Sequence, residues 1–341
     1  IGQAVIHDEL AWGMLVQIPA TQSDGALYKE LLIRAQEMRL QVRFTPIGAE
    51  DYERWVGEQG QPRYVVTLLA RRLTARHLLT SAALVAKHGL NIDRITRLSG
   101  RSALNESDST RQSAVELTAR GQLNDARAMR ADLVRAAQEQ DVDIAIQADD
   151  LFRRNRRLIC FDMDSTLVVG EIIDELAARW GVGAEVAAIT ARAMGGELDF
   201  AASFRARVRL LKGLPEQVLQ QVAGSMTLTE GAERLIAILK ALGYRVAIIS
   251  GGFSWFATQL GRRLNVDYVH ANELEVIDGV VSGEVTGTVI DGERKALLLQ
   301  QIAEREQVSL AQTIAVGDGA NDLPMLSIAG LGVAFHAKPV V

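Results

Sequence analysis

Short alternating or apolar segments and longer amphipathic segments follow one another in a regular order between residues 63 and 147. Apolar side chains two residues apart predict half-buried strands, and apolar side chains three or four residues apart predict helices. The order is strand, helix, strand, strand, helix, strand, over residues 63–70, 74–89, 90–100, 111–121, 124–140 and 141–149. We therefore predict a βαββαβ domain over residues 62–148, with an exposed hairpin loop at 100–112.

This βαββαβ order is typical of a ferredoxin-like α+β fold, and it resembles an ACT domain, a small module that often binds amino acids. Residues 1–60 carry a shorter version of the pattern, with a strand expected within 11–20, a helix at 25–40 and a strand at 41–47. We interpret this first segment as a degenerate ACT-like unit that lies beside the complete one.

The turn after the first strand of the complete unit, residues 70–77, reads ARRLTARH and contains no glycine. ACT domains that bind ligands often have glycine in this turn. The resemblance therefore favours packing or dimerisation over ligand binding, and we expect a homodimer formed through the ACT-like region.

A different pattern begins at residue 157, where near-continuous apolar strands alternate with amphipathic helices. Strands of this kind are typical of a parallel sheet that is covered by helices on both faces. We expect them at 157–161, 245–250, 313–318 and 330–335, with crossover helices at 229–243 and 292–307. Residues 157–341 are therefore predicted to form a Rossmann-like α/β core.

Three further segments interrupt or precede this core. Residues 162–244 are mostly helix-forming and too long for a simple crossover, so we expect a helical cap over about 168–228. Asp278 and Gly279 predict a hairpin turn. Four arginines within 151–159 are interpreted as a solvated linker between the ACT-like region and the core.

Composition excludes several classes of partner. The chain of 341 residues is 48% hydrophobic and has a formal net charge of −5, so it lacks the basic excess that binding to nucleic acid or to a membrane surface requires. No apolar run approaches the roughly 20 residues that span a bilayer. Cys160 is the only cysteine, which rules out an internal disulfide and favours a reducing, cytoplasmic location.

Polar side chains of one chemical kind follow the core strands at the points where these strands end. Asp162 and Asp164 follow the first strand, Ser250 ends the second, and Asp318 and Asp322 follow the third, while Lys295 lies in the helix before it. The carboxyl ends of parallel strands meet at one edge of a sheet, so these groups should share a pocket. Clustered carboxylates need a hard cation to stay ionised, and ligands that are all oxygen suit Mg²⁺.

A site that combines Mg²⁺, a lysine and a hydroxyl group is suited to a phosphoryl group, whose oxygens carry negative charge. Asp162 is the candidate nucleophile, because a carboxylate can form an aspartyl-phosphate. Asp164 lies two residues further along an extended chain and therefore on the same side. We predict that it protonates the leaving oxygen and then activates water.

The motifs DMDST, SGG, Lys295 and GDGAND, in this order over residues 157–336, resemble the four motifs of the haloacid dehalogenase-like superfamily. The cap resembles that of the phosphoserine phosphatase family. This resemblance implies that Glu171 receives the substrate ammonium and Arg207 its carboxylate. It also implies pocket-wall roles for Met194, Gly195 and Phe200, substrate contacts for Ser250, Gly251, Lys295 and Asn321, and metal ligation by Asp162, Asp164, Asp318 and Asp322.

The function implied by this resemblance is Mg²⁺-dependent hydrolysis of O-phospho-L-serine through an aspartyl-phosphate, the last step of L-serine biosynthesis. Two alternatives stay open at this point. The chain could act on another small phosphomonoester, as a phosphatase or a phosphotransferase. It could also act mainly as an amino-acid sensor through residues 1–147.

Overall fold

A computed structural model describes residues 2–6, 9–18, 24–57, 60–100, 112–337 and 341. The chain divides into two compact units, residues 1–61 and residues 62–341. No helix among the described residues is both long enough and apolar enough to cross a membrane.

The first unit contains an antiparallel strand pair and two helices: β1 (Gly2–Ile6), β2 (Glu9–Gly13), α1 (Asp24–Glu37) and α2 (Ala49–Gly57). The predicted helix is therefore present, but the strand predicted at 41–47 is wrong, since these residues have no regular secondary structure. Val42 and Ile47 are 43% and 55% exposed, so the apolar alternation is not buried in a sheet. A strand needs a hydrogen-bonded neighbour, which this segment lacks among the described residues.

The second unit begins with a four-stranded antiparallel sheet in the order β4-β5-β3-β6. Its elements are β3 (Arg63–Ala70), α3 (Ala75–Lys87), β4 (Leu90–Arg97), β5 (Ser113–Gly121), α4 (Ala126–Gln140) and β6 (Asp143–Ala148). The two helices cover one face and bury Val66, Leu117 and Met129 between helix and sheet. This order confirms the predicted ferredoxin-like fold, while most of the predicted hairpin loop, at 101–111, lies outside the described residues.

The arginine-rich segment that follows is only partly solvated, since two of its four arginines, Arg153 and Arg156, are engaged by the domains on either side. Nη2 of Arg153 lies 2.6 Å from the Glu116 carboxylate. Arg156 is only 8% exposed and donates to the carbonyl oxygen of Gly330 at 3.3 Å. These guanidinium groups join the ACT-like sheet to the core. The sequence shows four arginines here but not the positions of the acceptors that they reach.

The core contains a six-stranded sheet in the order β10-β9-β8-β7-β11-β12. All neighbouring strands are parallel except β10, which is antiparallel to β9. The strands are β7 (Leu158–Phe161), β8 (Arg245–Phe253), β9 (Tyr268–Ile277), β10 (Val280–Thr286), β11 (Thr313–Gly317) and β12 (Leu331–Ala334). The predicted hairpin turn forms at Asp278 and Gly279, which both have positive φ. The strand that leads into this turn, β9, begins at Tyr268, and its first part pairs with β8. Sequence patterning missed this first part.

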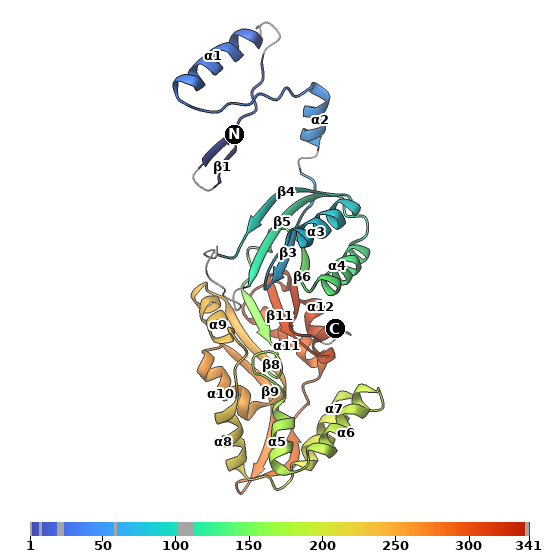
Figure 1. Ribbon diagram of the computed structural model, residues 1–341. Coiled ribbons are helices and arrows are strands. Elements are labelled where there is room, and N and C mark those ends of the chain that lie inside the picture. Colours follow the sequence, from blue (N-terminus) through green and yellow to red (C-terminus); the bar gives the residue numbers. More distant parts are fainter. Residues whose placement is uncertain (1, 7–8, 19–23, 58–59, 101–111, 338–340) are drawn as a thin grey trace. The chain divides into compact units, whose positions relative to one another are not determined.

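Alternate side chains of the central strands are buried under different helices, as expected for a parallel sheet. Ile159 and Phe161 face the layer that contains α9 (Ala232–Ala241) and α10 (Ser254–Leu264). Leu158 and Cys160 pack against residues of α11 (Gly292–Arg305) and α12 (Leu323–Ile328). Figure 1 shows these two helices apart from α9 and α10. Two short 3-10 helices, η1 (Leu310–Gln312) and η2 (Ala320–Asp322), flank β11. Burial raises the pKa of the Cys160 thiol far above its usual range.

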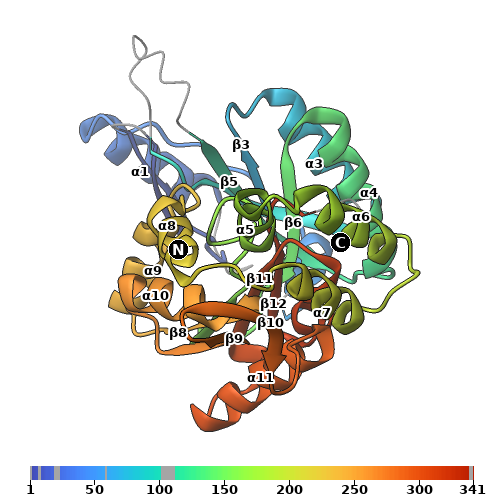
Figure 2. The ribbon, with the colours of Figure 1, turned by 90° about the horizontal axis from the view of Figure 1, so that it is seen from below.

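The predicted cap consists of four helices: α5 (Ile172–Trp180), α6 (Gly183–Met194), α7 (Phe200–Leu210) and α8 (Glu216–Ser225). Figure 2 looks onto this cap, with α5, α6 and α7 toward the viewer. The link between α7 and α8 is attached to the β9–β10 hairpin, because the Gly213 amide donates to Val281 at 2.8 Å and the Glu216 amide donates to Gly279 at 2.9 Å. The hairpin therefore serves as an anchor for the cap.

Candidate active site

The centre of the site is a buried lysine between two aspartates. Asp162 follows β7, Asp322 ends η2, and Lys295 lies in the first turns of α11. Nζ of Lys295 is 2.9 Å from Oδ1 of Asp162 and 2.7 Å from Oδ1 of Asp322. Sequence analysis predicted this meeting of three segments, and the structure brings the three side chains together.

Burial decides the electrostatics of this centre. Loss of solvation raises the pKa of Asp162 to about 7, although the charge of Lys295 acts in the opposite direction. Burial disfavours the charged form of Lys295 and lowers its pKa. The two neighbouring carboxylates have the opposite and larger effect, so that the lysine pKa is raised. The lysine is therefore charged at neutral pH, whereas Asp162 needs a further positive charge nearby to be fully ionised.

Three carboxylates offer a place for that charge. One oxygen each from Asp162, Asp318 and Asp322 lies within 4.8 Å of the other two, and all three residues are buried. Two of these side chains are already in contact with Lys295, so the group retains an excess of negative charge. A set of oxygen ligands with this charge fits a hard divalent cation such as Mg²⁺.

Asp164 is not one of the three residues whose carboxylate oxygens lie within 4.8 Å of one another. Its Oδ1 accepts the amide N–H of Ile172 at 3.0 Å, at the first residue of α5. Burial raises the pKa of Asp164 well above its usual range, and the charge of Glu171 adds to this effect. The raised pKa favours the protonated form of Asp164, and this form suits a general acid. Its role as a metal ligand stays a prediction.

The loop of Ser250, Gly251 and Gly252 passes close to Asp164 and to the cap. A Cβ atom on Gly252 would lie 2.5 Å from Oδ2 of Asp164, and one on Gly251 would lie 2.9 Å from Cζ of Phe200. A side chain at either position would therefore displace the neighbouring group, so close approach favours glycine at both. Oγ of Ser250 accepts the Gly252 amide at 2.8 Å.

Two charged cap residues predicted from the sequence also lie near the site. Glu171 is the N-cap residue of α5, and Oγ of Ser165 donates to its Oε1 at 2.9 Å. Arg207 lies on α7, where burial lowers its pKa and the charges of Glu171, Asp174 and Asp164 partly offset that effect. Nε of Arg207 is buried and has no hydrogen-bond partner among the described residues, which leaves a donor for a bound anion.

For three other predicted residues, Met194, Gly195 and Asn321, the structure gives the position in the fold. Met194 is 69% exposed at the end of α6, and Gly195 is the C-cap residue of this helix. Asn321 lies within η2, next to Asp322, with its amide oxygen against Gly319. The roles of these three residues stay predictions.

Three residues of the site were not singled out from the sequence. Oγ1 of Thr166 lies 3.5 Å from Oδ1 of Asp318, Ser165 donates to Glu171, and Asn272 hydrogen-bonds to Gly251. Asn272 had a weak signal, because asparagine is depleted in β-strands. Ser165 and Thr166 had none beyond their place in the DMDST motif.

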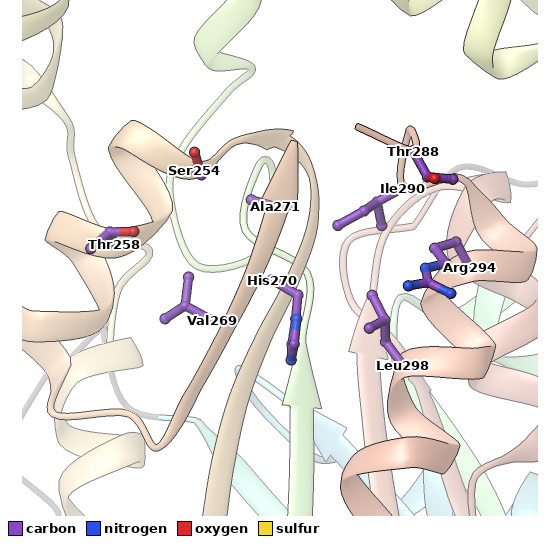
Figure 3. Close-up of a pocket in the computed structure, with 9 residues that line it drawn as sticks. All are labelled: Ser254, Thr258, Val269, His270, Ala271, Thr288, Ile290, Arg294 and Leu298. Atoms are coloured by element: carbon purple, nitrogen blue, oxygen red, sulfur yellow. The ribbon is translucent and has the colours of Figure 1, made fainter. Parts of the chain in front are cut away.

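A separate cavity of about 310 Å³ lies at β9, bordered by α10 and α11. Figure 3 shows His270 directed toward the side of α11, where Arg294 and Leu298 lie, while Ser254 and Thr258 belong to α10. None of the predicted catalytic residues lines this cavity, so the reaction site is defined by the carboxylates and not by the cavity.

Comparisons with protein families agree with this geometry. Residues 159–327 match the haloacid dehalogenase-like hydrolases, and residues 1–45 and 63–147 match ACT domains. A crystal structure of a haloacid dehalogenase family hydrolase from Salmonella enterica superposes with a TM-score of 0.68 at 32% identity, over 81% of this chain and 91% of that one. The fold and the site thus define a haloacid dehalogenase-like hydrolase.

Two relatives that match this chain over its whole length indicate which kind of hydrolase it is. The chain is 41% identical to a phosphoserine phosphatase of Streptomyces coelicolor, over all of this chain and 79% of that protein. It is 39% identical to phosphoserine phosphatase SerB2 of Mycobacterium tuberculosis, over all of this chain and 80% of that protein. The chain therefore belongs to the haloacid dehalogenase-like hydrolase family and is a phosphatase.

Proposed function

We propose that the chain hydrolyses O-phospho-L-serine to L-serine and phosphate, as the last step of L-serine biosynthesis. The observation that carries this proposal is the buried, unpartnered Nε of Arg207 on the same cap that holds Glu171. A guanidinium group and a carboxylate beside a phosphoryl site complement the carboxylate and the ammonium of an amino-acid phosphate. The names of the two full-length relatives support the same substrate.

In the first half of the proposed reaction, a carboxylate oxygen of Asp162 attacks phosphorus and the bond from phosphorus to the serine oxygen breaks. Asp164, whose protonated form is favoured by burial, donates its proton to the departing serine oxygen. Lys295 offsets the charge of the reacting groups from 2.9 Å. Mg²⁺ held by Asp162, Asp318 and Asp322 would neutralise charge on the phosphoryl oxygens and keep Asp162 ionised.

The second half releases phosphate from the aspartyl-phosphate. Asp164 is now ionised and takes a proton from a water molecule, whose oxygen attacks phosphorus. The bond from phosphorus to the Asp162 oxygen breaks, so that both carboxyl groups return to their first state. Ser250, Gly251 and Asn321 are the proposed contacts to the phosphoryl oxygens, and Phe200, Met194 and Gly195 form the proposed wall around the serine part.

We also propose a homodimer formed through the ACT-like region, where β4 (Leu90–Arg97) is an edge strand of the sheet. Edge strands present unpaired backbone groups to a second chain. Light scattering during gel filtration, for the full chain, measures the mass directly.

The test of the function is phosphate release with and without added Mg²⁺. Three substrates separate the requirements: phosphoserine, phosphoethanolamine, which lacks the carboxylate, and p-nitrophenyl phosphate. We expect Asp162→Asn to abolish release from all three, and Arg207→Ala to reduce release from phosphoserine alone. If the native chain prefers phosphoethanolamine, the proposed reaction stands but the proposed substrate is wrong. Capture of the phosphoryl group by added homoserine would instead show a phosphotransferase.

A further inference from the structure

Strand β8 bulges away from β9 where it passes the active site. Ile249 is paired with His270, and the next pair is Phe253 with Asn272. Three residues of β8, 250–252, therefore lie opposite a single residue of β9. Such a bulge breaks the ladder of backbone hydrogen bonds and leaves carbonyl and amide groups in need of other partners.

The side chain of Asn272 supplies one of these partners and makes a second hydrogen bond outside the bulge. It is 2% exposed, its Nδ2 donates to the carbonyl oxygen of Gly251 at 2.8 Å, and its Oδ1 accepts the amide of Ile290 at 2.7 Å. The orientation of the amide follows from its neighbours, because a carbonyl oxygen can only accept and a backbone N–H can only donate. Asn272 thus ties the bulge to the segment just before Asp291, the N-cap residue of α11.

The peptide unit between Gly251 and Gly252 is held at both ends. Asn272 holds its oxygen, and its N–H, which belongs to Gly252, donates to Oγ of Ser250 at 2.8 Å. Because this contact makes Oγ the acceptor, the hydroxyl hydrogen of Ser250 is left to donate elsewhere. Hydrogen bonds in such a chain also polarise one another and strengthen the last donor.

We infer that Asn272 is a positioning residue for phosphoryl recognition, which acts through the Gly251–Gly252 peptide to direct the Ser250 hydroxyl at a phosphoryl oxygen. In this inference Asn272 acts through the peptide that it holds and not by contact with the substrate. This role rests on the proposed function in one respect: the substrate must be a phosphate monoester. It predicts that Asn272 and Ser250 contribute to the same step and not to independent ones.

The test is a double-mutant cycle on kcat/KM with Asn272→Asp and Ser250→Ala. Aspartate keeps the acceptor for Ile290 and removes the donor to Gly251. We expect each single variant to lose about 10- to 100-fold in kcat/KM, the size expected for one hydrogen bond to a charged group. The double variant should lose little more than Ser250→Ala alone, and inorganic phosphate should inhibit Asn272→Asp more weakly than the native chain.

Leu274→Ala is the matched control, because Leu274 is a core residue two positions along the same strand. It should lower the melting temperature without changing kcat/KM. Asn272→Ser, whose hydroxyl can replace only one of the two contacts, serves if Asn272→Asp does not fold. Losses that multiply in the double variant would overturn the inference, as would native kcat/KM in a folded Asn272→Asp.

Measuring both phosphoserine and p-nitrophenyl phosphate separates this inference from the proposed function. The chain of contacts from Asn272 through the Gly251–Gly252 peptide to Ser250, here called the relay, acts on the phosphoryl group. The loss of kcat/KM in Asn272→Asp should therefore be similar for both substrates. A loss confined to phosphoserine would contradict the relay. A native chain that hydrolyses only p-nitrophenyl phosphate would overturn the proposed substrate and still allow the cycle to be measured.

Discussion

The ammonium group of Lys295 and the carboxylate of Asp322 lie 2.7 Å apart, and both side chains are completely buried. Asp322 also accepts the Gly319 amide at 3.0 Å, and Lys295 reaches Asp162 at the end of the neighbouring strand. The lysine therefore joins the ends of β7 and β11 as well as offsetting charge in the site.

Replacing this lysine should affect stability and activity together. Lys295→Met leaves two buried carboxylates without their cation, so we expect the free energy of unfolding to fall by about 3–5 kcal/mol and phosphate release to be lost. Lys240→Met is the control, because Lys240 pairs with Asp267 in a partly exposed position and should cost only about 1 kcal/mol or less. Urea unfolding measures both, and equal costs would contradict the structural role.

The metal requirement should depend on Asp318. Asp318→Asn removes one charge from the three-carboxylate group, and we expect the Mg²⁺ concentration for half-maximal phosphate release to rise by about tenfold or more. Asp174→Asn removes an acidic charge from the cap outside that group and should leave the Mg²⁺ dependence unchanged. An unchanged dependence in Asp318→Asn would exclude this residue as a ligand.

Selectivity should depend on Ser165, which donates to Glu171 at 2.9 Å. Ser165→Ala removes this donor, and since both side chains carry a Cβ atom, the cost of the positive φ at this position is unchanged. We expect KM for phosphoserine to rise about three- to tenfold, in line with the loss of one hydrogen bond. KM for p-nitrophenyl phosphate should not change, and equal changes would contradict a role in binding the ammonium.

The close approach at Gly252 predicts a loss of function with little loss of stability. An added methyl group would displace the Asp164 carboxylate, which is the end of a side chain and can move. We expect Gly252→Ala to lower kcat by about 100-fold or more, because Asp164, the proposed general acid, is misplaced. Gly224→Ala, in α8 with open space around it, is the control. Native kcat in Gly252→Ala would contradict the geometry.

Acid should weaken the fold through His270. Burial lowers the pKa of His270 below the ordinary 6.5, and the charges of Arg294 and Arg305 lower it further. The unfolded chain therefore binds this proton more readily, so that stability is unaffected above pH 6.5 and decreases as the pH falls below it. His270→Gln should reduce the difference in unfolding free energy between about pH 7.5 and about pH 5.5. The same difference in both proteins would contradict the assignment.

The grouping of the candidate catalytic residues could be predicted because it depends on topology. Once the apolar strands are recognised as parallel, their carboxyl ends must meet, and this places Asp162, Asp318 and Ser250 near one another. The order of polar residues after each strand then indicates the chemistry. No detail of packing is needed for that step.

Features that depend on a single contact could not be predicted in the same way. The direction of the Asp164 carboxylate depends on where α5 begins, and the burial of Arg156 depends on the carbonyl group of Gly330. Residues 41–47 have the alternation of a strand and yet form none, because alternation does not provide a neighbouring strand. Asn272 is the instructive case, since its buried amide compensates for a bulge that sequence patterns do not reveal.

The buried position of Cys160 has a practical consequence. A thiol reacts as its thiolate, and in the interior of the sheet this group is neither ionised nor accessible while the chain is folded. A cysteine introduced on the surface of the cap would therefore be the only fast-reacting site for a fluorescent or spin label. Distances between cap and core could then be followed during turnover without first removing a native cysteine.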